Sequence, residues 1–202
     1  MLNSQNVSHV IYLIDDDDDC RLSIERFLKT KGYQVFYYRQ PEDFLAESLI
    51  MPSVIILDMC MPSISGVDVQ ATLIKRQISL PMIFVSGQST FQEAIAAMKH
   101  GAFAFLEKPF SPEELLTAVR QSFEALETET ANAMKLLKKE AMLELLSPRE
   151  RMVFDLLCEG FSNPQLVEHL AISMATVKEY KANVFRKLEV DHLSELMKLK
   201  QI

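Results

Sequence analysis

Short runs of apolar residues, each closed by polar or turn-forming residues, recur along the first half of the chain. They span residues 10–14, 33–38, 54–57, 82–85 and 102–106. Between them lie segments whose apolar residues are three and four positions apart, the spacing of one helix face. Short runs with little polar alternation are typical of strands buried on both faces. The pattern therefore predicts an α/β fold, with a parallel sheet between two layers of helices.

Polar side chains stand where these predicted strands end: Asp15, Asp16, Asp58, Ser86 and Lys108. The carboxyl ends of parallel strands meet at one edge of a sheet, so we expect these side chains to converge. Clustered carboxylates suit a hard divalent cation such as Mg²⁺. Asp58 could then act as a nucleophile that forms an aspartyl-phosphate, with Lys108 neutralising phosphoryl oxygens and Ser86 donating a hydrogen bond.

Each of these residues also has an ordinary structural explanation when it is taken alone. An aspartate after a strand is usually a turn residue or a helix cap, and a lysine before a proline usually lies in solvent. Residues 15–19 are five aspartates in a row. We expect the first two to face the cation and the other three mainly to cap the next helix. The order of the polar residues on successive strand ends favours the shared site.

The pattern changes after Ser111. Neither glycine nor proline occurs between Glu113 and Ser147, and apolar residues alternate three and four apart from Leu116 to Leu137. This predicts one long helix. We expect its first part to pack on the sheet and its later part to be a helical linker with some capacity to dimerise. A short coiled coil and a flexible linker are the alternatives for the later part.

The last part of the chain predicts four short helices. Capping signals mark their starts at Ser147, Asn163 and Ser173. The second and third helices have the shape of a helix-turn-helix, and the third spans about 174–188. It carries four basic residues against one acidic residue: Lys178, Lys181, Arg186 and Lys187 against Glu179. Its inward face would hold Val177, Val184 and Leu188.

Net charge, cysteine content and the length of apolar runs limit the classes of function that fit this chain. The formal net charge is −7, which excludes binding of nucleic acid through bulk positive charge, so any DNA binding must rest on a local basic face. The 3 cysteines are scattered, which argues against a disulfide framework or a zinc site. No apolar run approaches a membrane span and no signal-peptide pattern opens the chain, so we expect no membrane association and a cytoplasmic location.

The first part of the chain resembles the receiver domain of two-component response regulators. The motifs that carry the resemblance are Asp15-Asp16, the run from Asp58 through Met61-Pro62 to Gly66, Ser86-Gly87, and Glu107-Lys108-Pro109-Phe110. The resemblance implies a flavodoxin-like (βα)5 fold over residues 1–122 and phosphorylation of Asp58 by a sensor histidine kinase. It implies Mg²⁺ ligands at Asp15, Asp16, Asp58 and the backbone carbonyl of Cys60. It also implies that Ser86 and Phe105 form a switch pair and that Lys108 contacts the phosphoryl group.

The last part resembles the four-helix LuxR-type DNA-binding domain. The matching stretches are 146–151, 159–163, Ile172-Ser173, Thr176-Val177-Lys178, Asn183 and Arg186-Lys187-Leu188. With a receiver in front, the chain is similar to FixJ/NarL-class transcriptional regulators, with a helical linker over 123–145 and the DNA-binding domain over 146–202. The resemblance implies a homodimer on activation that binds double-stranded promoter DNA, and RNA polymerase as a further candidate partner.

The resemblance also implies which residues of the third helix meet DNA: Thr176, Val177, Lys178, Tyr180, Lys181, Asn183 and Lys187. The lysines would mostly contact phosphates, and Tyr180 or Asn183 would contact base edges. Two residues depart from the family pattern. Pro164 stands where a lysine is usual, which removes a phosphate contact, and Tyr180 stands where a histidine is usual, which makes the base-reading pattern unsafe to transfer.

We interpret the chain as a phosphorylation-controlled transcription factor, and two rivals remain. One is a phosphatase that passes through an aspartyl-phosphate, but such enzymes need an acid two residues after the nucleophile, where this chain has Cys60. The other is a receiver whose C-terminal domain binds protein and not DNA.

Overall fold

The computed structural model describes residues 9–87 and 91–201. These residues fall into two compact units, with the division between Thr128 and Glu129. Helix α5 (Pro112–Glu144) crosses the division. Among the described residues, no helix combines the length and the hydrophobicity that crossing a bilayer requires.

A parallel five-stranded sheet forms the centre of the first unit within the residues described. Its strands are β1 (Val10–Ile14), β2 (Gln34–Tyr38), β3 (Ser53–Asp58), β4 (Met82–Ser86) and β5 (Ala104–Glu107), in the order β2-β1-β3-β4-β5. This is the strand order of flavodoxin-like folds, so the fold prediction is confirmed. In the sheet register Ile14 lies beside Leu57, and Asp58 lies beside Val85. The carboxyl ends of these strands therefore lie at one edge.

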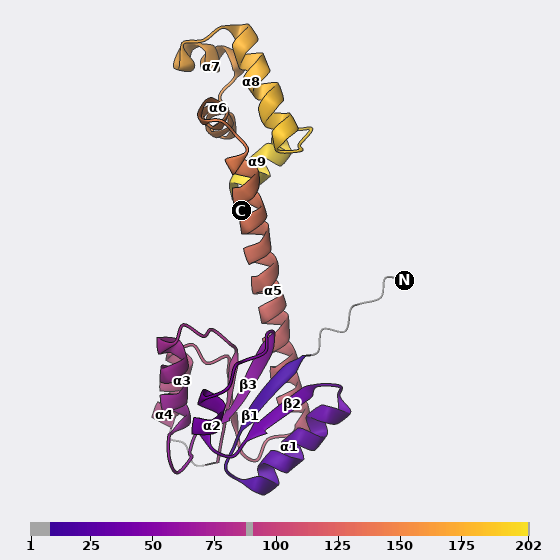
Figure 1. Cartoon of the computed structure of the whole chain (residues 1–202), viewed down its shortest axis with the longest axis vertical. Coiled ribbons are helices and arrows are strands. Elements are labelled where there is room, and N and C mark those ends of the chain that lie inside the picture. The colour runs from indigo at the N-terminus through magenta and orange to yellow at the C-terminus, as the bar shows by residue number, and fades with distance from the viewer. Residues whose placement is uncertain (1–8, 88–90, 202) are drawn as a thin grey trace. The chain divides into compact units, whose positions relative to one another are not determined.

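Two hydrophobic clusters cover the two faces of this sheet, because successive side chains of a strand point in opposite directions. One cluster contains Tyr12 and Leu57 from the sheet and packs against α2 (Pro41–Leu45), α3 (Gly66–Lys75) and α4 (Phe91–Lys99). The other contains Leu13 and Ile56 and packs against α1 (Asp18–Thr30) and α5. Figure 1 shows α1 and α3 on opposite sides of the sheet. Burial on both faces explains why the strands are apolar throughout.

Local capping explains where most helices begin. Asp17 is the N-cap of α1, and its carboxylate accepts hydrogen bonds from the amides of Asp19 and Cys20 at 3.0 and 3.3 Å. The expected capping box at Ser147 is present. The prediction that Asn163 caps the next helix is wrong by one residue. Ser162 is the N-cap of α7 (Asn163–Leu170), because the Gln165 side chain accepts a hydrogen bond from the Ser162 amide at 2.8 Å.

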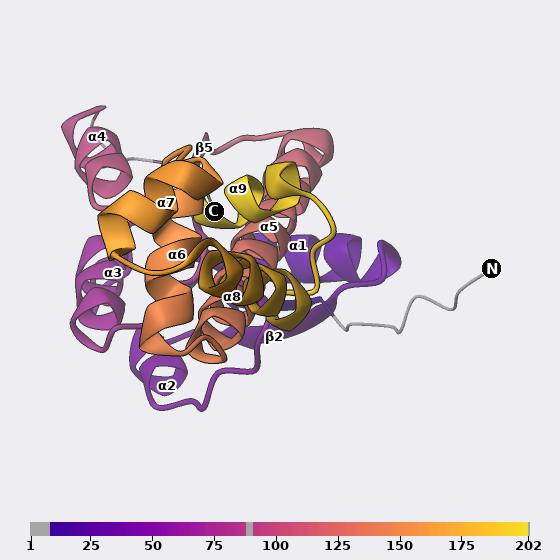
Figure 2. The ribbon, with the colours of Figure 1, turned by 90° about the horizontal axis from the view of Figure 1, so that it is seen from above.

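The second unit is built from the end of α5 and four further helices: α6 (Pro148–Cys158), α7, α8 (Met174–Lys187) and α9 (Leu193–Gln201). Figure 2 shows these helices from another direction. They share one hydrophobic cluster, which includes Val153, Leu166 and Val184. The prediction of a long helix is confirmed, because α5 is continuous, and residues 127–138 within it are exposed. The flexible-linker alternative does not match this continuous helix.

Candidate functional site

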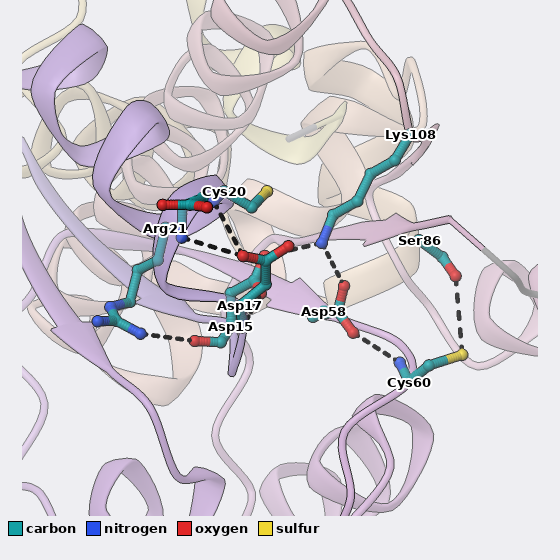
Figure 3. A network of polar contacts seen from close by, with 9 residues as sticks. Asp15, Asp17, Cys20, Arg21, Asp58, Cys60, Ser86 and Lys108 are labelled. Atoms are coloured by element: carbon teal, nitrogen blue, oxygen red, sulfur yellow. Dashed lines mark hydrogen bonds and ion pairs between the residues drawn. The ribbon is translucent and has the colours of Figure 1, made fainter.

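One ammonium group joins the ends of three strands. The Nζ atom of Lys108, which follows β5, lies 2.8 Å from Oδ2 of Asp15 and 2.6 Å from Oδ1 of Asp58 (Figure 3). Asp15 follows β1 and Asp58 ends β3, and both carboxylates are buried. The amide of Lys108 also donates to the carbonyl oxygen of Ser86 at 2.7 Å. The structure thus brings Asp15, Asp58 and Lys108 together through their side chains, and Ser86 joins them through its backbone.

The chain around Asp58 fixes the position of its carboxylate. Its Oδ2 atom accepts a hydrogen bond from the amide of Cys60 at 2.8 Å. The Gly66 amide donates to the carbonyl oxygen of Met59 at 3.0 Å, which holds the start of α3 against the end of β3. A Cβ atom on Gly66 would lie 2.5 Å from the Asp58 carbonyl oxygen and 2.9 Å from the Phe84 ring. Only glycine permits this close approach.

Burial and charge act against each other in this cluster. Burial raises the pKa of the Asp58 carboxyl, although the hydrogen bond and positive charge of Lys108 oppose the shift. Burial alone would lower the pKa of Lys108, but the carboxylates of Asp15 and Asp58 raise it overall. Lys108 is therefore charged at neutral pH and neutralises part of the buried negative charge.

The donor atoms at this edge fit Mg²⁺. Asp15 and Asp58 offer hard carboxylate oxygens that converge on the Lys108 ammonium. Asp16, the next residue after Asp15, is half-buried, and Cys60 is exposed. In the part of the chain that the structure describes, no three acidic, histidine or cysteine side chains form a complete ligand set. A cation here would take its further ligands from backbone oxygen and water, which is how Mg²⁺ is usually held.

The two residues of the expected switch pair lie on adjacent strands. Ser86 is buried at the end of β4, and its hydroxyl lies 3.8 Å from the Sγ atom of Cys60 (Figure 3). Phe105 is half-buried on β5, pairs in register with Phe84, and packs against the cluster that contains α3 and α4. The role of this pair as a switch stays a prediction.

Arg21 was not among the predicted site residues, but it is part of the network in Figure 3. Arg21 is buried, and its guanidinium donates to the carbonyl oxygen of Asp15 at 3.2 Å and forms an ion pair with Asp18. A signal for it exists in the sequence, because Asp18 and Arg21 have the i, i+3 spacing of helical ion pairs.

Helix α8 presents some of the predicted DNA contacts to solvent and buries one. Lys178 is exposed, whereas Tyr180 and Asn183, together with Thr176 and Lys181, are half-buried. Val177 is 0% exposed and lies in the core of the second unit, so the prediction that its side chain contacts DNA is wrong. The helical spacing of the apolar residues places the Val177 side chain in the core, although the residue belongs to the motif that resembles the LuxR-type domain.

Lys187 is engaged within the second unit. Its Nζ atom lies 2.6 Å from Oε2 of the buried Glu150 and 3.0 Å from the carbonyl oxygen of Leu145. The hydrogen bond from Lys187 holds the pKa of Glu150 below its usual value. This lysine therefore links the end of α8 to the start of α6, and its contact with DNA stays a prediction.

Family models and known proteins agree with this geometry. The model of the response regulator receiver domain matches residues 11–120, and the model of the luxR family of bacterial regulatory proteins matches residues 144–199. The response regulator protein TmoT of Ectopseudomonas mendocina is 34% identical over 191 residues, which cover 94% of this chain and 87% of that protein.

Two further relatives cover nearly the whole chain. The transcriptional regulatory protein FixJ of Rhizobium meliloti is 31% identical over 95% of this chain and 94% of its own length. The solved structure of the response regulator StyR is similar with a TM-score of 0.82 and 28% identity, covering 96% of this chain and 99% of that one. The chain belongs to the response regulators that join a receiver domain to a LuxR-type DNA-binding domain and regulate transcription.

Proposed function

We propose that a sensor histidine kinase phosphorylates Asp58 and that phosphorylation controls binding of the second unit to promoter DNA. In this proposal residues 1–122 act as the receiver, 123–145 as a helical linker, and 146–202 as the DNA-binding domain. The observation that carries it is the Lys108 ammonium between the buried carboxylates of Asp15 and Asp58. A cation that already bridges two carboxylates can bind phosphoryl oxygens that arrive between them.

In the proposed step, a carboxylate oxygen of Asp58 attacks the phosphorus of a phosphohistidine. The new O–P bond forms as the P–N bond breaks, and the departing imidazole nitrogen keeps the electron pair and takes a proton from solvent. Lys108 binds a phosphoryl oxygen, and the Cys60 amide holds the acceptor carboxylate in place. Mg²⁺ bound by Asp15, Asp16, Asp58 and the Cys60 carbonyl would neutralise charge on the transferring group.

The proposed output starts at the switch pair. The Ser86 hydroxyl moves toward the phosphoryl group and leaves space into which Phe105 turns, which shifts the population of conformers on the β4–β5 side. The shifted state forms a homodimer, and two copies of α8 enter neighbouring major grooves of promoter DNA. RNA polymerase is the proposed further partner at the promoter. Because promoter DNA lies in the cytoplasm, the protein would act there.

Phosphoryl uptake tests this proposal. We expect the purified chain to gain one phosphoryl group from phosphoramidate in the presence of Mg²⁺, as measured by intact-protein mass spectrometry. Asp58→Asn should abolish the uptake, because an amide oxygen is a poor nucleophile. Asp43→Asn, which removes an exposed carboxylate on α2, should not change it. Uptake by the Asp58→Asn protein at the wild-type rate would reject Asp58 as the acceptor.

The phosphatase alternative finds no support at this site. Its general acid would stand at residue 60, and the Cys60 side chain offers only a thiol, whose sulfur lies beside the Ser86 hydroxyl.

A further inference from the structure

Five consecutive aspartates, residues 15–19, lead from the end of β1 into the first turn of α1, but only the first two belong to the proposed ligand set. Like charges so close together repel one another and compete for any cation nearby. The next two aspartates make separate contacts of their own. Asp17 caps α1, and the Asp18 carboxylate pairs with Arg21 and lies 3.6 Å from Arg39.

Arg21 contacts the first and the fourth residue of this acidic segment. Its Nη1 atom donates to the backbone carbonyl oxygen of Asp15 at 3.2 Å, and its Nη2 atom pairs with the carboxylate of Asp18. The guanidinium carbon lies 5.2 Å from the centre of the Tyr37 ring, a distance at which a cation is attracted to an aromatic face. Two nitrogens of one planar group thus connect the end of β1 to the first turn of α1.

Arg21 keeps this position at a cost. It is 7% exposed, and its Nε atom is buried without a hydrogen-bond partner among the described residues. A buried donor without a partner is unfavourable, so the contacts at the two Nη atoms must offset its desolvation. A lysine in this place would keep the charge but could not reproduce the forked geometry.

We propose that Arg21 is a positioning residue that sorts the five aspartates. It fixes the backbone of Asp15, so that the Asp15 side chain points to Lys108, and it holds Asp18 away from the cation. The inference rests on the proposed function, because the cation that the aspartates receive is the Mg²⁺ of that proposal. Residues that orient metal ligands without touching the metal typically change metal affinity by about tenfold or more.

Calorimetric titration of the full chain with MgCl₂, without any phosphoryl donor, tests the proposal. We expect Arg21→Lys to weaken Mg²⁺ binding about tenfold, because the charge is kept and the two-point contact is lost. The midpoint of thermal unfolding of the same protein shows separately whether Arg21→Lys is folded. Equal Mg²⁺ affinity in Arg21→Lys and the wild type would overturn the inference and leave the proposed function intact. A wild type that does not bind Mg²⁺ would overturn both.

A second pair of variants decides the matter if Arg21→Lys does not fold. Asp18→Asn removes the negative charge that pairs with Arg21, whereas Asp19→Asn removes the charge of the neighbouring exposed carboxylate, which lies outside this ion pair. Both variants lose one negative charge from consecutive residues in the first turn of α1. We expect Asp18→Asn to bind Mg²⁺ about threefold more weakly than Asp19→Asn. Equal affinities would mean that only charge matters, and the positioning role would be rejected.

Discussion

Lys108 and Lys187 use the same chemistry in the two units, because each ammonium pairs with a buried carboxylate. The position of Lys108 beside Asp58 could be predicted, since it follows a strand whose carboxyl end lies at the same edge of the sheet as that of β3. The ion pair of Lys187 could not be predicted, because its partner Glu150 is 37 residues away in the sequence. The presence of several basic residues on a helix face also does not show which of them are paired within the domain. The contact between Arg21 and Asp15 could not be predicted for a related reason, because its acceptor is a backbone carbonyl, which sequence patterns do not encode.

We expect Lys187→Met to destabilise the second unit by roughly 1–2 kcal/mol at neutral pH, because it leaves the buried Glu150 without its partner. The pKa of Glu150 is lowered in the folded state, so this contribution is complete above its ordinary value of 4.5 and is lost as pH falls through that value toward the lowered one. Urea unfolding of both proteins at several pH values measures the difference.

The matched control for this change is Lys178→Met, which removes an exposed lysine from the same helix and should shift the free energy of unfolding little at any pH. A Lys187→Met penalty that stays constant from neutral pH to below 4 would show that lost packing, and not the ion pair, is responsible.

At the scale of elements, hydrophobic period was the most reliable guide. It predicted the strands, the continuous α5 and the inward face of α8, because burial repeats with the geometry of the backbone. Where a family motif and the hydrophobic period disagreed about exposure, the period was the better predictor. Val177, for example, belongs to the motif but is buried. The start of α7 was misplaced because Ser162 and Asn163 are both good caps, and only the Gln165 contact separates them.

Helix α8 yields a prediction about DNA. We expect Lys178→Ala to weaken binding to a promoter fragment and to reduce the slope of log K against log salt concentration by about 1, since one phosphate contact releases about one counterion. Lys75→Ala removes an exposed lysine from α3 and should leave the slope unchanged. Fluorescence anisotropy across a range of salt concentrations measures both. An affinity that is insensitive to both salt and Lys178→Ala would reject binding of α8 in the major groove. The absence of binding to promoter DNA would favour the alternative of a protein-binding second unit.

For the whole molecule, the main feature is that two separate cores share one helix. The first unit packs both faces of its sheet, and the second packs its helices around a cluster of its own. Phe123 and Leu126 of α5 belong to the first core, and Leu143 belongs to the second. The sequence predicted a long helix here, but it could not tell at which residue the helix passes from one core to the other.

We expect Leu166→Ala to lower the stability of the second unit by about 2–5 kcal/mol, because Leu166 is fully buried in its core. Hydrogen exchange followed by mass spectrometry should show faster exchange in α6 to α9, with β1, β3 and β4 unaffected. Leu28→Ala is the reciprocal variant, since Leu28 is fully buried in the first unit. Equal acceleration across both units in either variant would mean that they unfold as one.

The exposed stretch of α5, residues 127–138, is held in shape by its own peptide hydrogen bonds more than by packing. A stretch of this length is close to the limit at which a lone helix persists in water. While this stretch is helical, a rotation at one end is passed on to the other end. While it is unfolded, its two ends can rotate independently. The balance between these two states would set how stiffly a signal passes along the chain, so replacing alanines in this stretch with glycines should soften that transmission without touching either core.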